Sequence, residues 1–195
     1  YEQMNFALDK GVNFFDTAEL YPVPAAAERY AHTEIIIGHW LAQNKKRDQV
    51  VLASKIAGKA AFTAFIRENG FSKEALNTAL EGSLKRLKTD YLDLYQLHWP
   101  ERNTNFFGQR GYQHKEDELW EDNFQEILET LKGFVKAGKI RQVGISNENP
   151  WGAMRYMELH RKDPSLPRMV SCQNPYNLLN RLYETGMAEV SMREN

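Results

Sequence analysis

Residues 83–100, "SLKRLKTDYLDLYQLHWP", contain the end of one predicted helix, a short break and one predicted strand. The helix is predicted over residues 72–87, where Ser72 can accept the first free backbone amide. The strand is predicted over residues 92–98, and it is mostly apolar. A helix followed by a short apolar strand is the unit from which parallel sheets are built.

The same unit recurs in both directions along the chain. Strands are predicted at residues 12–16, 50–55, 92–98, 141–146 and 169–173. Helices are predicted between them at residues 33–44, 72–87, 122–136 and 150–161. In the third helix, apolar residues recur at spacings of three and four from Phe124 to Val135, which indicates one face turned toward a sheet. Strands separated by helices predict parallel pairing, with both faces of each strand buried.

The two ends of the sequence also read as helices. Residues 1–10 predict the later part of an amphipathic helix that Gly11 ends, and residues 181–195 predict a helix still running at the last residue. We therefore expect the 195 residues to be one domain and an excerpt of a longer protein.

The composition excludes several function classes. The chain is 42% hydrophobic and 26% charged, with a net charge of -1 and scattered basic residues, so we expect neither a nucleic acid nor a membrane as partner. Cys172 is the only cysteine and is predicted to be a small buried apolar residue. The histidines show no metal-ligand spacing, so no metal is predicted. We expect a cytoplasmic location.

Two folds fit alternating strands and helices. The doubly wound sheet and the eight-stranded barrel both carry their sites beyond the carboxyl ends of the strands. A dinucleotide-binding Rossmann unit needs a glycine-rich turn after its first strand, but the residues after Asp16 are "TAELY". The residues that deserve inspection are therefore those at the strand ends.

The strand ends carry a carboxylate, an ammonium, an imidazole and several amides, with a phenol close by. A nearby ammonium would favour the ionised form of a phenol, so we expect Lys55 to lower the pKa of Tyr21 and Asp16 to hold Lys55. Each residue alone also has a purely structural interpretation, as a turn former, a loop aromatic or a satisfied histidine. Their joint placement favours a catalytic rim formed by Asp16, Tyr21, Lys55, His98, Ser146, Asn147 and Gln173.

Over its whole length the sequence resembles the aldo-keto reductase family. The resemblance is carried by "DTAELY" (16–21), "VLASK" (51–55), "SLKRLKTDYLDLYQLHWP" (83–100), "GKIRQVGISN" (138–147) and "QNPYNLLNR" (173–181). Pro22, where most members have glycine, and the loop after His98 look most like the bacterial Tas-type branch.

This resemblance implies a (β/α)8 barrel of which about five strands are present, with the first strand and the last two outside the chain. It implies NADPH as cofactor and the reversible reduction of an aldehyde or ketone. In its catalytic tetrad Tyr21 would be the general acid, Lys55 and Asp16 would tune it, and His98 would orient the carbonyl group. Ser146, Asn147 and Gln173 match the residues that hold the nicotinamide carboxamide.

A long loop follows the third strand. Residues 99–120 have no clear period but carry several aromatic residues, and loops of this length are commonly functional. We predict that Trp99, Phe106 and Phe107 form a pocket for an apolar or aromatic carbonyl compound, with Trp99 nearest the chemistry. The loop 56–71, which contains Phe62 and Phe65, is predicted to face it.

Two other functions stay open at this point. One is a subunit that binds NADPH without turnover, as in potassium-channel beta subunits, which the resemblance also covers. The other is a barrel enzyme that uses Lys55 as a Schiff base, which would give Asp16 and Tyr21 no role. The isolated 195 residues are expected to be inactive or poorly soluble because of open sheet edges. The physiological substrate and the oligomeric state are not predicted.

Overall fold

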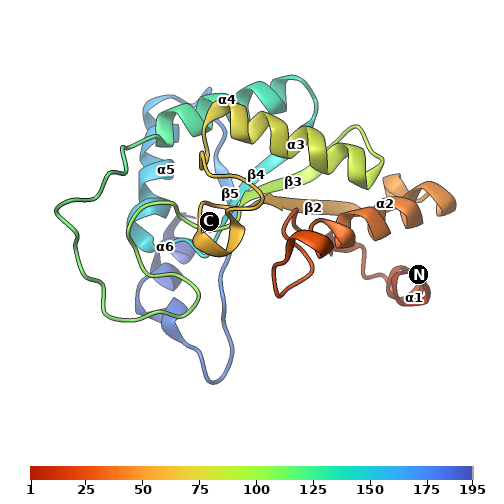
Figure 1. Cartoon of the computed structure of the whole chain (residues 1–195), viewed down its shortest axis with the longest axis horizontal. Helices are drawn as coiled ribbons and strands as arrows, with labels where there is room; N and C mark the ends of the chain where they lie inside the picture. The colour runs from red at the N-terminus through yellow and green to blue at the C-terminus, as the bar shows by residue number, and fades with distance from the viewer. Residues whose placement is uncertain (195) are drawn as a thin grey trace.

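The computed structural model describes residues 1–194, which alternate between helices and strands (Figure 1). The helices and strands are α1 (Glu2–Asp9), β1 (Phe14–Asp16), α2 (His32–Asn44), β2 (Val51–Ile56), α3 (Lys73–Leu87), β3 (Leu92–Leu97), α4 (Phe124–Lys136), β4 (Ile140–Ser146), α5 (Pro150–Lys162), β5 (Met169–Gln173) and α6 (Met187–Glu194). Short 3-10 turns are formed by Ala27–Arg29, Arg47–Gln49, Ala61–Thr63 and Leu182–Thr185.

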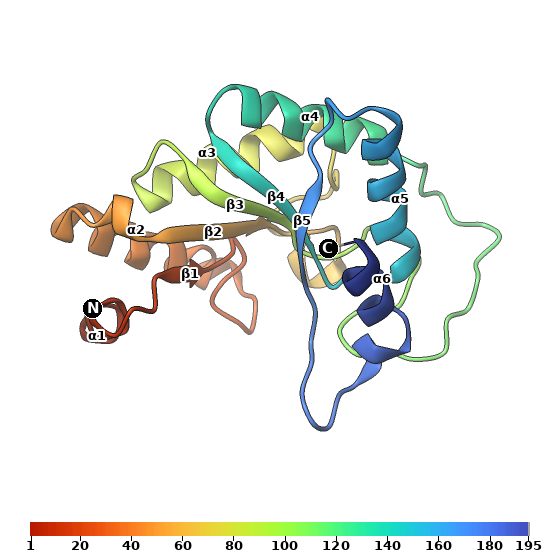
Figure 2. The ribbon, with the colours of Figure 1, turned by 180° about the vertical axis from the view of Figure 1, so that it is seen from behind.

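The five strands form one parallel sheet in the order β1-β2-β3-β4-β5. Neighbours in sequence are therefore neighbours in the sheet, as in a barrel, whereas a doubly wound sheet reverses its strand order at a switch point. Figure 2 shows the strands curling and twisting, with α2, α3 and α4 behind them on one face. The structure confirms a partial (β/α)8 arrangement of five strands.

The hydrophobic core lies between these helices and the sheet. In α4 the expected face is buried through Phe124, Ile127, Leu128, Leu131 and Phe134. Val135 was predicted to share this face, but it is 38% exposed.

The predicted caps and turns are confirmed at three positions. The Ser72 side chain accepts a hydrogen bond from the Ala75 amide at 3.2 Å, at the start of α3. Gly138 follows α4 with a φ of +73°, and Gly11 follows α1 with a φ of +82°. Both values lie in the left-handed region that glycine adopts without strain.

Three sequence predictions are wrong in detail. β1 has only three residues and Phe14 is exposed, because β1 lies at the sheet edge with only β2 beside it. The helix predicted over 181–195 is interrupted at Gly186, which separates a 3-10 turn from α6; Asn195 lies outside the described residues. Cys172 is only partly buried, and its thiol hydrogen-bonds to Asn174 at 3.3 Å.

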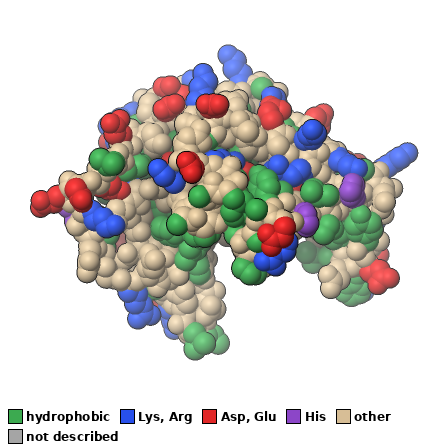
Figure 3. Space-filling model, viewed as in Figure 1, with side chains coloured by type: hydrophobic (Ala, Val, Ile, Leu, Met, Phe, Trp, Pro, Cys, Tyr) green, Lys and Arg blue, Asp and Glu red, His purple; other side chains and the backbone are tan. Residues whose placement is uncertain are grey.

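The surface carries acidic and basic side chains interspersed, with hydrophobic groups between them, on the face that Figure 3 shows. No helix within residues 1–194 is long and apolar enough to cross a bilayer. Among the same residues, no group of three or more His, Cys, Asp or Glu side chains is arranged to hold a metal ion.

Candidate active site

The parallel strands bring the predicted residues to one rim of the sheet. Asp16, Ser146 and Gln173 are the last residues of β1, β4 and β5. Lys55 is the penultimate residue of β2, and His98 directly follows β3. Lys55 and His98 were predicted to be the last residues of their strands, and the structure moves each boundary by one residue.

Lys55 is deeply buried at the rim, with its side chain 1% exposed. Its Nζ donates to Asp16 Oδ2 at 2.6 Å and to the Thr17 carbonyl at 2.9 Å. Burial lowers the pKa of Lys55, and the charge of Asp16 and its hydrogen bond oppose this effect. The expected pairing of Asp16 with Lys55 is present, and it provides the partner that a buried ammonium requires.

Asp16 also accepts hydrogen bonds from two glutamine amides. Gln96 Nε2 lies 3.2 Å from Asp16 Oδ1, and Gln173 Nε2 lies 2.9 Å from Asp16 Oδ2. Gln96 was missed by the sequence analysis, although a polar residue inside the apolar strand β3 was a usable signal. Because Gln96 is in register with Lys55 on the neighbouring strand, its side chain reaches the same carboxylate.

Tyr21 and His98 lie beside this charge pair. Their ring centroids are 5.5 Å apart in an edge-to-face arrangement, and Lys55 Nζ lies 5.1 Å from the Tyr21 ring centroid. Burial, followed by the charge of Lys55, lowers the pKa of His98 to about 3. The His98 ring is therefore neutral at neutral pH, and its buried Nδ1 makes no hydrogen bond with residues 1–194.

The expected lowering of the Tyr21 pKa is wrong for this structure. Burial raises the pKa of Tyr21, and the negative charge of Asp16 raises it further. The Lys55 ammonium donates to Asp16 and the Thr17 carbonyl, and its positive charge does not outweigh these effects. Tyr21 consequently keeps its proton at neutral pH, which is the form that an acid catalyst needs before it reacts.

A cluster of hydroxyl and amide groups lies at the ends of β4 and β5. Ser146 Oγ donates to the Gln173 carbonyl at 2.8 Å, and the Asn147 side chain donates to the His98 carbonyl at 2.9 Å. Asn147 has a φ of +52°, a left-handed conformation that asparagine tolerates better than most residues. The predicted residues are thus together, and the His98 backbone is tied to them.

The aromatic residues form a wall beside His98. Trp99 is 1% exposed, and its ring lies 4.8 Å from His98, 5.5 Å from Phe62 and 5.6 Å from Phe107. Phe107, which is 47% exposed, presents the open surface, and with Phe106 and Asn147 it borders a cavity of about 170 Å³. Phe65, in the same loop as Phe62, packs against Tyr30.

The family model described as "Aldo/keto reductase family" matches residues 1–195. The chain belongs to the aldo/keto reductase family. This membership accounts for the sequential parallel strands and agrees with the resemblance found in the sequence.

Several curated proteins are similar to this aldo/keto reductase. "Protein tas" of Escherichia coli is 43% identical over all of this chain, which covers 56% of that protein. The "Uncharacterized oxidoreductase YrpG" of Bacillus subtilis is 34% identical over 93% of this chain and 50% of its own length. The "Aldo-keto reductase YhdN" of the same species is 32% identical over 95% of this chain and 46% of its own length. The chain thus spans about half the length of these relatives.

Proposed function

We propose that the full-length protein is an oxidoreductase that reduces aldehydes or ketones with NADPH, and that Tyr21 is its general acid. One observation carries this proposal: a protonated phenol lies beside the ion pair of buried Lys55 with Asp16 and beside a neutral imidazole, at one rim of the sheet. Membership of the aldo/keto reductase family and the printed names of its relatives support the same reaction class.

The residues present fit a nicotinamide cofactor. Ser146, Asn147 and Gln173 place one hydroxyl and two amides at adjoining strand ends, and such groups can hydrogen-bond both ends of a carboxamide. NADPH would supply the hydride, which is the chemistry of the cofactor. The role of these residues is to hold the ring in one orientation, and Gln173 is exposed at the rim, where a ligand can reach it.

The tetrad would handle the proton and the carbonyl group. A neutral His98 has one N–H group that can hydrogen-bond the carbonyl oxygen and hold it near the phenol. Tyr21 would donate its phenolic proton to the oxygen of the carbonyl group as that group is reduced. The tyrosinate that remains is stabilised by Lys55, whose ammonium lies beside the ring.

The test compares the full-length native protein with its Tyr21→Phe variant, using NADPH absorbance and a panel of carbonyl substrates. We expect turnover to fall by roughly a hundredfold or more, because general acid catalysis contributes about that much. Quenching of tryptophan fluorescence by NADPH should be unchanged. Tyr91→Phe is the matched control, since Tyr91 precedes β3 at the opposite end of the sheet.

The competing function is NADPH binding without turnover. It would be supported if NADPH bound to both the native protein and Tyr21→Phe while neither reduced any carbonyl compound. A native protein that neither binds NADPH nor turns over would overturn the proposal altogether.

A further inference from the structure

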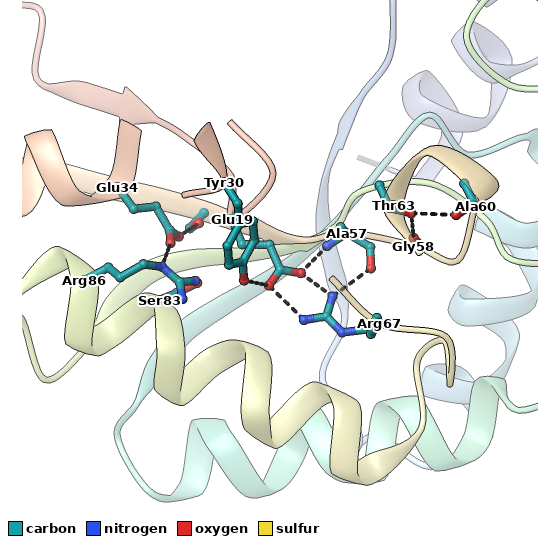
Figure 4. A network of polar contacts seen from close by, with 11 residues as sticks. Glu19, Tyr30, Glu34, Ala57, Gly58, Ala60, Thr63, Arg67, Ser83 and Arg86 are labelled. Atoms are coloured by element: carbon teal, nitrogen blue, oxygen red, sulfur yellow. Dashed lines mark hydrogen bonds and ion pairs between the residues drawn. The ribbon is translucent and has the colours of Figure 1, made fainter. Parts of the chain in front are cut away.

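A second buried ion pair lies next to Tyr21, and the tetrad does not include it. Glu19, two residues before Tyr21, has a fully buried side chain (0% exposed). Its carboxylate accepts from the Ala57 amide at 2.6 Å, from the Tyr30 hydroxyl at 3.1 Å and from Arg67 Nη2 at 2.8 Å, and Arg67 Nη1 binds it as well. Figure 4 shows these groups converging on the one carboxylate.

Arg67 belongs to a different loop, the one between β2 and α3. Its guanidinium binds both carboxylate oxygens of Glu19, and its Nη1 also donates to the Ala57 carbonyl at 3.0 Å. The Glu19 amide is bonded in turn to the Lys55 carbonyl at 3.2 Å. The ion pair therefore joins the loop that carries Tyr21 to the end of β2 and to the loop that follows it.

The geometry of this pair indicates an orienting role. A buried ion pair adds little net stability compared with apolar side chains of the same shape. Bidentate hydrogen bonding between an arginine and a carboxylate, however, fixes the orientation of both groups. Tyr30, which also donates to the carboxylate, stays neutral, because burial and then the charge of Glu19 raise its pKa to about 12. Every contact of the carboxylate is thus directional.

The position of the Tyr21 phenol depends on this loop. Tyr21 lies outside any helix or strand, and its backbone is held by Ala18 and Thr33 through bonds of 3.1 and 3.3 Å. Leu20, between Glu19 and Tyr21, is buried in a small cluster with Ala57 and Trp99. A shift of the Glu19 backbone would consequently move the phenol relative to Lys55 and His98.

We propose that Glu19 and Arg67 form a clamp that positions Tyr21 against Lys55 and His98. The two are positioning residues, because they act through the loop and contact none of the reacting groups. This inference rests on the proposed function for its effect on turnover. A displacement of about 1 Å in a catalytic group can lower the rate by roughly a hundredfold.

The experiment uses the full-length protein and three variants, Glu19→Gln, Arg67→Met and Arg67→Lys. For Glu19→Gln and Arg67→Met we expect kcat to fall by about ten- to a hundredfold. The KM for NADPH should be unchanged, since the residues proposed to hold the nicotinamide lie at the ends of β4 and β5. The double variant Glu19→Gln, Arg67→Met should have a kcat no lower than that of either single variant, because each single substitution already removes the clamp. Arg67→Lys keeps the buried charge and should give an intermediate kcat.

Arg47→Met is the matched control. Arg47 forms a partly buried ion pair of 2.8 Å with Asp93, and it also binds the Tyr91 and Val50 carbonyls. This pair lies at the opposite ends of β2 and β3 from the rim. Its loss should lower the unfolding temperature with no change in kcat, which separates positioning from general stability.

Hydrogen exchange of residues 17–24, followed by mass spectrometry, gives a second measurement that does not need activity. We expect faster exchange of this segment in Glu19→Gln and Arg67→Met, and native exchange in Arg47→Met. Unchanged exchange would overturn the clamp, and so would an unchanged kcat in an active enzyme. If the native protein has no turnover at all, the proposed reductase fails, and the exchange result alone decides the clamp.

Discussion

At the residue scale, burial sets the protonation states at the rim more than mutual charge does. Lys55 and Asp16 neutralise each other at 2.6 Å, so neither dominates its surroundings. Tyr21 and His98 are both held in their neutral forms, one as a protonated phenol and the other as an unprotonated imidazole. A protonated Tyr21 beside a neutral His98 is suited to hydrogen-bond an uncharged carbonyl group.

The buried neutral state of His98 predicts a dependence of stability on pH. The pKa of His98 falls from 6.5 to about 3 on folding. Between these two pH values His98 is protonated in the unfolded chain and unprotonated in the folded chain. The contribution of His98 to the free energy of unfolding is complete above pH 6.5. It is lost as the pH falls toward 3, by about 1.4 kcal/mol per pH unit. Urea unfolding of the full-length protein at several pH values should show this slope, and His98→Gln should remove it.

The exposed His39 on α2 provides the control for this measurement. His39→Gln should retain the native pH dependence. Equal slopes in the native protein and in His98→Gln would show that His98 is not buried in its neutral form.

The aromatic wall predicts a preference among substrates. Phe107 presents its ring at the cavity, and contacts between aromatic rings contribute about 0.5–1.5 kcal/mol beyond buried area. Phe107→Leu should therefore lower kcat/KM for an aromatic aldehyde relative to an aliphatic one by roughly three- to tenfold. Trp151→Leu, which changes an exposed ring on α5, should leave the ratio unchanged. An unchanged ratio in Phe107→Leu would argue against an aromatic substrate.

At the element scale, close packing of α2 on α3 depends on Gly38. A Cβ atom there would lie 2.1 Å from the Arg86 carbonyl oxygen and 2.8 Å from the Leu87 backbone, which α3 cannot easily move. We expect Gly38→Ala to destabilise the protein by about 1–3 kcal/mol, despite the higher helix propensity of alanine. Gly133→Ala on α4 is the matched variant, with no atom within 4 Å of its Cβ. It should stabilise by about 0.5–1 kcal/mol, and both changes can be measured by urea unfolding.

Local sequence patterns predicted the helices and strands well. The ion pair that they missed joins residues far apart in the sequence. The apolar spacing in α4, the Ser72 cap and the strand ends are local features, and the structure confirms them. Glu19 and Arg67 are 48 residues apart, and no periodic pattern connects them. Their pairing depends on the paths of two irregular loops, so the sequence analysis did not find it.

At the scale of the whole molecule, the sheet has two open edges among residues 1–194. β1 pairs only with β2, and β5 pairs only with β4. Phe14 on β1 is 52% exposed and Val170 on β5 is 47% exposed. Open parallel edges carry unpaired backbone groups beside apolar side chains, and such edges template association between chains.

We therefore expect the isolated polypeptide of residues 1–195 to self-associate. Size-exclusion chromatography with light scattering should show a mass that rises with protein concentration. The double variant Phe14→Lys and Val170→Lys should reduce this association, because charges on edge strands oppose strand pairing. Leu119→Lys changes a 98% exposed residue in the long loop, away from both edges, and should have little effect. A monomer at every concentration would contradict the prediction, and equal effects of edge and loop substitutions would assign the association to general surface charge rather than to the open strands.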